Sequence, residues 1–279
     1  MLHHTMEPGM DQAIYVGMAA PIRKTYTVLM DEKTMAQEID RVIVEAVRSK
    51  LPVYIYVPMD VTGSLLDAKR LTTPLDTAIL NSKGMEDEIV SSILELIKKS
   101  SAPAILADVL AIRHGGKELV GKLMNLTKFP TYSTPLSKGV VDETSPYFNG
   151  LYNGSGKFTS NLRIHRVKLT KYPVSFDGVA EAIEISDLVL DIGPLHSDSN
   201  TGGFTRNITN NHTILLGHNY CQIHDKKYEG IHFWPVLKRI VEEIKKQPAQ
   251  YQKQSWSKLE VSCPWIDVSI LLTNGSLHF

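Results

Sequence analysis

Short strand-like runs alternate along this chain with segments of helical periodicity. Residues 53–57 are almost all β-branched or aromatic, and residues 104–107 and 188–192 form further apolar runs. Apolar side chains recur at helical spacing in 85–99 and 233–244. Because strands that alternate with helices build a parallel sheet covered on both faces, this order predicts an α/β fold.

The same reasoning extends to weaker signals. A helix is expected around 35–47, where Asp31 or Thr34 can cap the start and Pro52 follows the end. Residues 62–84 show little periodicity and are expected to link two domains. Further expectations are helices at 117–126 and 179–185 and strands at 132–133 and 213–216.

The charge balance argues against several classes of partner. Thirty Lys and Arg residues match thirty Asp and Glu residues, so no nucleic acid or anionic membrane is expected to bind. Neither a run of about 18 apolar residues nor a secretory leader is recognised, so no membrane span or export is expected. Cys221 and Cys263 are far apart, which argues against a disulfide framework or a cysteine zinc site. The expected compartment is the reducing cytoplasm.

Six segments, taken in order, resemble one known family. They are 2–5 (LHHT), 38–43 (EIDRVI), 51–61 (LPVYIYVPMDV), 105–108 (ILAD), 134–139 (TPLSKG) and 188–194 (LVLDIGP). They resemble the thiamine-diphosphate-dependent 2-oxo acid decarboxylases, of the pyruvate, phenylpyruvate and indolepyruvate decarboxylase type. The resemblance covers roughly 1–155 and 174–247.

Members of that family carry a pyrimidine-binding domain, a middle α/β domain and a diphosphate-binding domain. The resemblance implies that residues 1–62 are the C-terminal part of the first domain and that 63–82 are a linker. Residues 83–247 then form a complete, Rossmann-like middle domain with a parallel sheet, and 248–279 a tail. We therefore expect a chain truncated at both ends, whose strand at 53–57 lacks sheet partners and makes the first segment poorly soluble.

Residues 156–173 interrupt the resemblance, because 153–155 should continue directly into 174–179. Codon degeneracy allows this segment to be a retained intron whose removal keeps the reading frame. Residues 261–279 allow the same interpretation and are then not part of the native fold. The alternative is a genuine surface insertion followed by a disordered tail.

His3 and His4 are the residues to which the resemblance assigns catalysis. The family carries a His-His pair at this point, where it relays protons around the cofactor-bound intermediate. Imidazole suits that task because its unperturbed pKa is about 6.5. The loop that follows, 6–11 (MEPGMD), departs from the Gly-Asn-Gly-Asp-like stretch common in the family, so the setting of the pair differs. Without the resemblance, two exposed histidines near a chain end are the simpler interpretation.

The cofactors that the resemblance implies are thiamine diphosphate and Mg²⁺. In the family, a glutamate upstream of the histidine pair activates thiamine, and a Gly-Asp-Gly motif followed by an asparagine holds the diphosphate and the metal. No Gly-Asp-Gly occurs in this chain. The implied activity is the non-oxidative decarboxylation of a 2-oxo acid to an aldehyde and CO₂, by a homodimer or homotetramer. This chain alone is expected to be inactive, because it lacks the means to hold the cofactor.

A non-catalytic module is the alternative function. Residues 193–204 (GPLHSDSNTGGF) follow an expected strand, at the position where open α/β sheets bind ligands. Some thiamine enzymes outside this branch hold ADP or FAD in the corresponding domain, so the alternative places a nucleotide or a protein partner at 200–203. A polar turn at the sheet edge is the simpler interpretation. In this loop His196 and Ser199 stand where the family has more apolar residues.

Other motifs do not support a different chemistry. Gly154-Ser155-Gly156-Lys157 is not a phosphate-binding loop, because Leu151 stands where a glycine is required. No Gly-x-Ser-x-Gly elbow of a serine hydrolase is present. The spacing of three histidines fits no common zinc pattern; they are His212, His218 and His224.

The loop after 105–107 differs from the family at one position that bears on regulation. Leu110 stands where yeast-type pyruvate decarboxylases have a cysteine implicated in substrate activation, so regulation through a thiol is not expected here. Arg113 and His114 are expected to order this loop rather than to bind a ligand.

Overall fold

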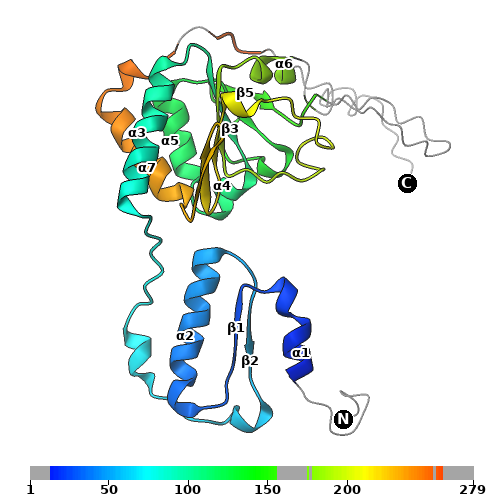
Figure 1. Cartoon of the computed structure of the whole chain (residues 1–279), viewed down its shortest axis with the longest axis vertical. Coiled ribbons are helices and arrows are strands. Elements are labelled where there is room, and N and C mark those ends of the chain that lie inside the picture. The colour runs from blue at the N-terminus through cyan, green and yellow to red at the C-terminus, as the bar shows by residue number, and fades with distance from the viewer. Residues whose placement is uncertain (1–12, 156–174, 176–177, 254–255, 260–279) are drawn as a thin grey trace, which may run out of the picture. The chain divides into compact units, whose positions relative to one another are not determined.

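A computed structural model of the chain describes residues 13–155, 175, 178–253 and 256–259 (Figure 1). His3 and His4, the whole segment 156–173 and the stretch 261–279 lie outside the described residues. The chain divides into two compact units, Met1–Ile79 and Leu80–Phe279. No helix within the described ranges is long and apolar enough to cross a membrane.

The first unit is built on two parallel strands and one long helix. Its elements are α1 (Ala13–Met18), η1 (Ala20–Ile22), β1 (Thr25–Val28), α2 (Glu32–Ser49), β2 (Val53–Tyr56), η2 (Met59–Val61) and η3 (Ala68–Thr72), the last within the expected linker. Strands β1 and β2 pair in register from Thr25 with Val53 to Val28 with Tyr56. Helix α2 packs against both strands, and its Met35 and Val42 are buried.

Helix α2 begins and ends where its local sequence allows. The Asp31 side chain accepts a hydrogen bond from the Lys33 backbone N–H at 3.0 Å, which confirms Asp31 as the N-cap. Lys50 ends the helix in the left-handed region, with φ of 57°, and donates its backbone N–H to Ala46. Pro52 follows and prevents the helix from continuing.

The strand expected at 53–57 forms, but it is not buried. The side chains of Ile55 and Val57 are 36% and 52% exposed. A two-stranded sheet has a single row of strand pairing, so both of its outer edges keep unpaired backbone groups. Such a sheet is marginally stable in water unless more strands or helices cover it.

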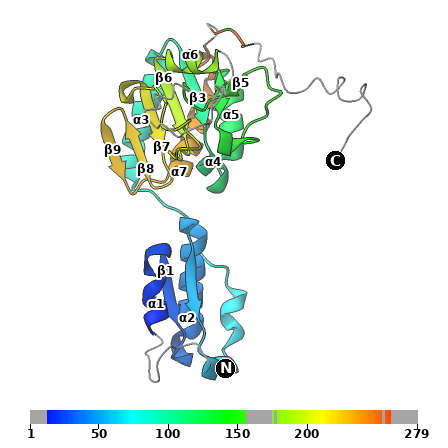
Figure 2. The same ribbon diagram turned by 90° about the vertical axis from the view of Figure 1, so that its right-hand side faces the viewer.

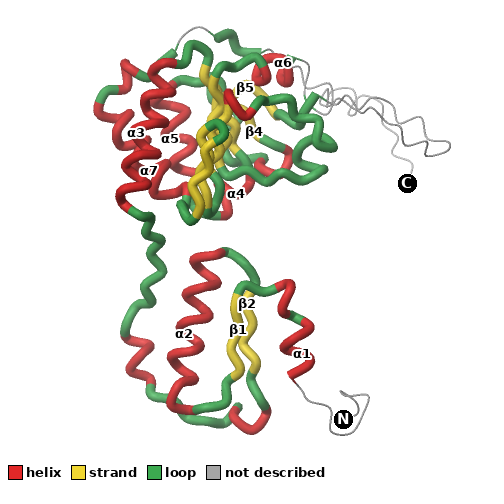
Figure 3. Tube along the Cα trace, in the orientation of Figure 1, coloured by secondary structure: helices red, strands yellow, loops and turns green. Residues whose placement is uncertain are grey.

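The second unit is a three-layer α/β domain, drawn by secondary structure in Figure 3. Its helices are α3 (Lys83–Lys99), α4 (Val109–Arg113), α5 (Lys117–Thr127), α6 (Val179–Glu184) and α7 (Phe233–Lys246), with short turns η4 (Pro135–Ser137), η5 (Asn210–His212) and η6 (Pro248–Gln250). Its strands are β3 (Pro103–Ala107), β4 (Thr131–Ser133), β5 (Phe148–Leu151), β6 (Leu188–Ile192), β7 (Thr213–Leu216), β8 (Tyr220–Ile223) and β9 (Lys226–Glu229).

The seven strands of this unit form one sheet in the order β5-β4-β3-β6-β7-β8-β9 (Figure 2). Every pairing from β5 to β7 is parallel, which confirms the expected parallel sheet. Strands β8 and β9 extend it as an antiparallel hairpin that the sequence had not predicted. The sheet is therefore parallel at its centre and mixed at one edge.

Both faces of the sheet are buried. Helices α3, α5 and α7 cover one face, where they share a core with Ile105, Leu190 and Ile214 (Figure 1). Helix α6 packs on the other face against Leu106 and Val189. Side chains alternate between the two faces along a strand, so Asp191 of β6 belongs to the same face as Val189.

The chain after α7 stays packed on this unit. Tyr251 is buried, and Gln252 donates its side-chain N–H to the Leu126 carbonyl at 3.1 Å. The Trp256 indole donates to the Lys128 carbonyl at 2.8 Å, and the Leu259 backbone donates to Asn149 Oδ1 at 2.8 Å. The described residues between 248 and 259 thus belong to the domain rather than to a free tail.

Candidate functional site

A buried polar cluster lies where β3, β4 and β6 end at their carboxyl sides. Its members are Asp108, Thr134, Ser137, Asn200 and Arg206. Because β3, β4 and β6 are parallel neighbours, the loops that follow them meet at one edge of the sheet. This is the edge at which the alternative interpretation of the sequence places a ligand-binding loop, whereas the simpler interpretation is a polar turn.

Asp108 is the centre of this cluster and is completely buried. Its Oδ1 accepts hydrogen bonds from Val109 N at 2.6 Å and from Thr134 Oγ1 at 2.7 Å. Its Oδ2 accepts one from Leu195 N at 3.0 Å. The Asn200 amide donates to both oxygens, at 2.8 and 3.0 Å. One carboxylate therefore ties together the loops that follow three strands.

Burial raises the pKa of Asp108 above its usual value, and the negative charge of Asp191 adds to this effect. The hydrogen bonds from Leu195, Thr134 and Asn200 act in the opposite direction. Burial has the larger effect on the pKa, so the ionised form of the Asp108 carboxyl is less favoured here than it would be in water.

Asn200 holds the loop 193–204 in place from within. Its Oδ1 accepts a hydrogen bond from Leu136 N at 3.1 Å, and its Nδ2 also donates to the Leu195 carbonyl at 2.9 Å. The loop begins at Gly193, whose φ is +70° and where an added Cβ would overlap the Ala111 backbone. Only glycine fits this position without moving α4.

The polar groups at 200–203 are used inside the loop itself. Thr201 Oγ1 donates to the Ser197 carbonyl at 2.6 Å and accepts from Phe204 N at 3.0 Å. Gly203 N donates to the Asp198 carbonyl at 2.7 Å. The backbone N–H groups of residues 203 and 204 are thus engaged within the loop and are not presented to a phosphate.

Arg206 lies between two buried carboxylates. Its Nη1 is 3.3 Å from Asp191 Oδ2, and its Nη2 is 3.6 Å from Asp108 Oδ2. His196 Nε2 approaches Asp191 Oδ2 at 3.6 Å, from a side chain that is about half exposed. One guanidinium therefore offsets the charge of two carboxylates, with the histidine at the rim.

These residues border a cavity of about 220 Å³ on the α6 face of the sheet. Strands β6 and β7 and the loop between them form its walls. The loop and β7 contribute both polar and apolar side chains, and β6 contributes Asp191. The lining residues are Asp191, His196, Thr201, Phe204, Arg206, Ile208, Asn210, Thr213 and Leu215.

The other residues singled out in the sequence are placed as follows. Leu110, Arg113 and His114 lie in and directly after α4, and the His114 ring stacks on His218 with centroids 5.4 Å apart. Cys221 is a buried free thiol on β8. In the part of the chain that the structure describes, no group of three or more His, Cys, Asp or Glu side chains could hold a metal ion.

His3 and His4 lie outside the described residues, so their role stays a prediction. The sequence offered no reason to expect a role for Asp108, Asp191 or Arg206, which the structure brings together. The available signal was an acidic residue at or just after the end of an apolar strand, in 105–108 and 188–192. Arg206, beyond the loop, gave no signal of its own.

Comparison with known proteins defines the class to which this fold belongs. The family model "Thiamine pyrophosphate enzyme, central domain" matches residues 90–169. These include β3, β4, β5 and the helices between them, and they extend into the segment expected to fall outside the family.

The chain is related more particularly to the pyruvate decarboxylases. It is 32% identical to the pyruvate decarboxylase of Kluyveromyces lactis over 88% of this chain and 40% of that protein. It is 32% identical to the enzyme of Candida glabrata over 99% of this chain and 48% of that protein. It is also 35% identical to a putative pyruvate decarboxylase of Schizosaccharomyces pombe, over 90% and 41%.

The chain thus corresponds to a part of the family of the pyruvate decarboxylases that includes the central domain of thiamine pyrophosphate enzymes, and it spans less than half the length of these relatives. Within the described residues, the polar cluster around Asp108 orders the loops at this end of the sheet.

Proposed function

We propose that this chain is part of a thiamine-diphosphate- and Mg²⁺-dependent enzyme that decarboxylates a 2-oxo acid to an aldehyde and CO₂. The observation that carries the proposal is the identity of 32% with relatives named pyruvate decarboxylase, over 88% or more of this chain. The α/β fold of the second unit and its central-domain match support it.

His3 and His4 are the catalytic residues of this proposal. Their imidazoles would pass protons to and from the reacting 2-oxo acid near neutral pH. The remaining cofactor-binding groups would come from chain outside these 279 residues, in a cytoplasmic homodimer or homotetramer. The 279-residue chain alone would then have no decarboxylase activity, because the cofactor provides the carbanion chemistry.

Sequencing the full transcript of this locus, followed by expression of its product, tests the proposal. We expect reading frames that extend upstream to a glutamate and downstream to a Gly-Asp-Gly motif, and a product that decarboxylates pyruvate or an aromatic 2-oxo acid. Replacing His3 or His4 by glutamine should lower kcat strongly, whereas His212→Gln on the second unit should not. A transcript that encodes these 279 residues alone would contradict the proposal.

The alternative of a nucleotide-binding module has less support from the structure. The loop at 200–203 uses its polar groups internally, and acidic Asp191 borders the adjacent cavity. A thermal-shift titration of the purified chain with ADP separates the two ideas. A saturable rise in melting temperature would favour the alternative, and no shift would remove it.

A further inference from the structure

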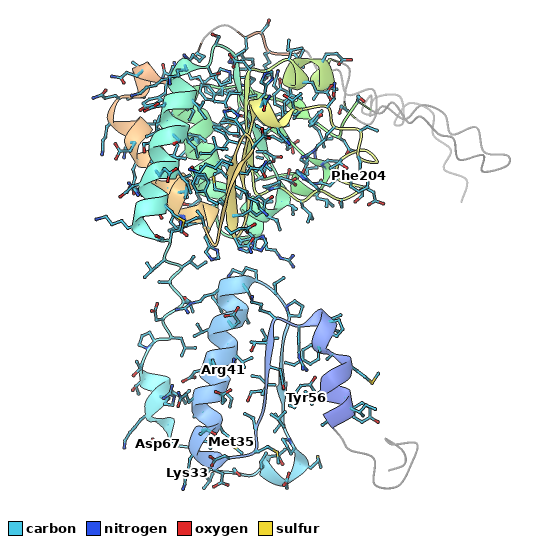
Figure 4. All side chains as sticks on the ribbon, viewed as in Figure 1. Lys33, Met35, Arg41, Tyr56, Asp67 and Phe204 are labelled. Carbon is cyan, nitrogen blue, oxygen red and sulfur yellow. The ribbon has the colours of Figure 1, made fainter. Side chains whose placement is uncertain are left out.

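The ends of three helices form a basic face on the second unit. Helix α7 packs against both α3 and α5, as Figure 1 shows, and Figure 4 adds their side chains. Asn81 Oδ1, ahead of α3, accepts a hydrogen bond from His232 N, ahead of α7, at 2.8 Å. At the other end, Lys253 Nζ donates to the Lys98 carbonyl in the last turn of α3 at 3.2 Å. Helices α3 and α7 therefore run in the same direction and finish together.

Helix α5 finishes at the same place. The Gln252 side chain donates to the Leu126 carbonyl at 3.1 Å. The Trp256 indole donates to the Lys128 carbonyl at 2.8 Å. Lysines recur in the last turns of α3 and α7, at the end of α5 and in the segment that follows α7. The basic face consists of Lys98, Lys99, Lys128, Lys245, Lys246, Lys253 and Lys258.

Few carboxylates offset the charge of this face. Lys99 Nζ lies 3.5 Å from Glu95. Lys246 Nζ lies 2.6 Å from Glu243. In the ranges that the structure describes, the other five ammonium groups form no ion pair with a carboxylate. Asp187 also lies at this end, but it accepts hydrogen bonds from the residues that follow α3. The face therefore carries an excess of positive charge.

Helix dipoles account for only part of this charge. The C-terminal end of a helix favours cations, which explains the lysines in the last turns of α3 and α7. Lys253 and Lys258 lie beyond both helices, in the segment that follows α7. Neighbouring like charges repel one another and oppose the compact state, so an anionic partner would stabilise this face. The overall charge balance of the chain does not exclude such a partner, because the charges are unevenly distributed.

We propose that the basic face binds the surface of an anionic lipid bilayer. Its ligands would be the negatively charged headgroups of lipids such as phosphatidylserine. An ammonium group is a compact, hydrated point charge, so it attracts headgroups without a fixed geometry. Each lysine close to such a surface raises the affinity by about fivefold. This attachment goes beyond the proposed decarboxylase activity and needs none of its cofactors.

The surroundings of the face favour a lipid surface over nucleic acid. Single-stranded nucleic acid stacks on exposed aromatic rings, whereas here Tyr251 is buried and the Trp256 indole is bonded to Lys128. Proteins read the bases of a duplex mainly with arginine side chains, and the residues of the basic face are all lysines.

The same surroundings indicate how the lipid would be bound. Among the described residues from 245 to 259, and in the last turns of α3 and α5, no large apolar side chain is exposed. The contact would therefore be electrostatic, without insertion into the bilayer, and it would weaken as salt screens the charges.

Sedimentation of the full chain with lipid vesicles tests this inference. One set of vesicles contains phosphatidylcholine with about 30% phosphatidylserine, and the other contains phosphatidylcholine alone. We expect the chain to bind the anionic vesicles and not the neutral ones, and to be released by about 0.5 M NaCl. Equal binding to neutral vesicles, or no binding to the anionic ones, would overturn the inference.

Two matched variants locate the contact. One variant carries Lys98→Gln, Lys99→Gln and Lys245→Gln. The control carries Lys83→Gln, Lys117→Gln and Lys238→Gln, which remove the same charge from the opposite halves of α3, α5 and α7. All six side chains are exposed, so both variants should fold. We expect the affinity for anionic vesicles to fall by about 100-fold in the first variant and by less than about threefold in the control.

Two further outcomes would contradict the assignment. Unchanged binding of the first variant would show that another part of the chain makes the contact, for instance the five Lys and Arg residues of 156–173. Tighter binding to duplex DNA of random sequence than to vesicles, at the same concentration of negative charge, would overturn the lipid partner in favour of nucleic acid. None of these measurements needs thiamine diphosphate, so they do not depend on the proposed decarboxylase activity.

Discussion

At the scale of single residues, the carboxylate of Asp108 fixes the relative positions of three loops. It accepts hydrogen bonds from residues that follow β3, β4 and β6, namely Val109, Thr134 and Leu195, as well as from Asn200. Thr134 Oγ1 and the Asn200 amide each have one further acceptor, Ser137 Oγ and the Leu195 carbonyl, so removal of the carboxylate affects the backbone N–H groups of Val109 and Leu195 most. The loop that borders the cavity thus depends on one side chain.

Replacing Asp108 by alanine should destabilise the second unit by about 3–5 kcal/mol, because several buried donors and Arg206 lose their acceptor. Urea denaturation followed by tryptophan fluorescence measures the change in the free energy of unfolding. Asp198→Asn, on the exposed side of the same neighbourhood, should change it by less than about 0.5 kcal/mol. A similar small effect for Asp108→Ala would show that the network does not stabilise the fold.

Asp187 makes the stability of the fold depend on pH. Burial raises its pKa, but hydrogen bonds from Ser100, Ser101 N and Ala102 N outweigh that effect and lower the pKa below its usual value of 3.8. A carboxyl whose pKa is lowered by folding stabilises the native state above its unfolded pKa, and the effect is lost as the pH falls through the folded value.

The free energy of unfolding should therefore fall as the pH drops below about 3.8, and Asp187→Asn should make this fall less steep. Urea titrations between pH 2 and pH 6 measure it. Parallel curves for the wild type and the variant, with the same slope below pH 4, would contradict the role of Asp187.

At the scale of elements, the sequence correctly predicted the helices and strands whose local propensity agrees with the structure they adopt in the fold. The helices around 35–47 and 117–126 and the strands at 104–107 and 188–192 formed close to their expected bounds. The hairpin of β8 and β9 was not foreseen, because Tyr220–Glu229 mixes polar and apolar residues with no strict alternation. Sheet pairing, rather than local preference, makes it a pair of strands.

The cavity site was less accessible to sequence reasoning than the elements were. Asp191 and Arg206 are separated along the chain by the whole loop that contains His196 and Phe204. Their contact depends on how this loop folds back on the sheet, through Asn200 and Asp108. Sequence patterns report local periodicity and turns, and they carry little information about such a contact between distant residues.

Described residues that precede and follow the segment 156–173 are hydrogen-bonded to each other. Asn153 N donates to Ser175 Oγ at 2.8 Å, and Ser175 Oγ donates to the Gly154 carbonyl at 2.7 Å. Ser155 N donates a hydrogen bond to the Thr205 carbonyl at 3.2 Å. The described residues on either side of the segment therefore lie close enough to be connected directly.

Excising residues 156–173, so that Ser155 is followed by Val174, should leave the second unit folded. The melting temperature should stay the same or rise slightly, since a shorter loop costs less entropy to close. Circular dichroism and a thermal melt of the excised chain measure this. A loss of the cooperative transition would show that the segment contributes to the native fold.

At the scale of the whole molecule, the two units differ in how completely their sheets are covered. The second unit buries both faces of its central strands, under α3, α5 and α7 on one side and α6 on the other. The first has two strands, and several of its large apolar side chains are exposed; they include Met30, Ile55, Val57 and Met59. The stability of the chain is therefore concentrated in the residues after Leu80.

Residues 80–259 expressed alone should give a monodisperse protein with one cooperative unfolding transition, because their core is contained within the unit. Residues 1–79 expressed alone should associate or remain unfolded, because their strand edges and apolar side chains lack cover. Size-exclusion chromatography with light scattering compares the two. A soluble, monomeric first unit would contradict this expectation.

The order of strands in the larger sheet also sets the order in which it can assemble. Strand β3 pairs with β6, joining Pro103 to Leu188, and the chain between them forms α4, α5, β4, β5 and α6. Contacts between residues so distant in sequence slow folding, because a long loop must close before the pairing is gained. During synthesis, β3 cannot pair with β6 until β6 has left the ribosome. Each residue added between 151 and 179 lengthens the time before this pairing can form.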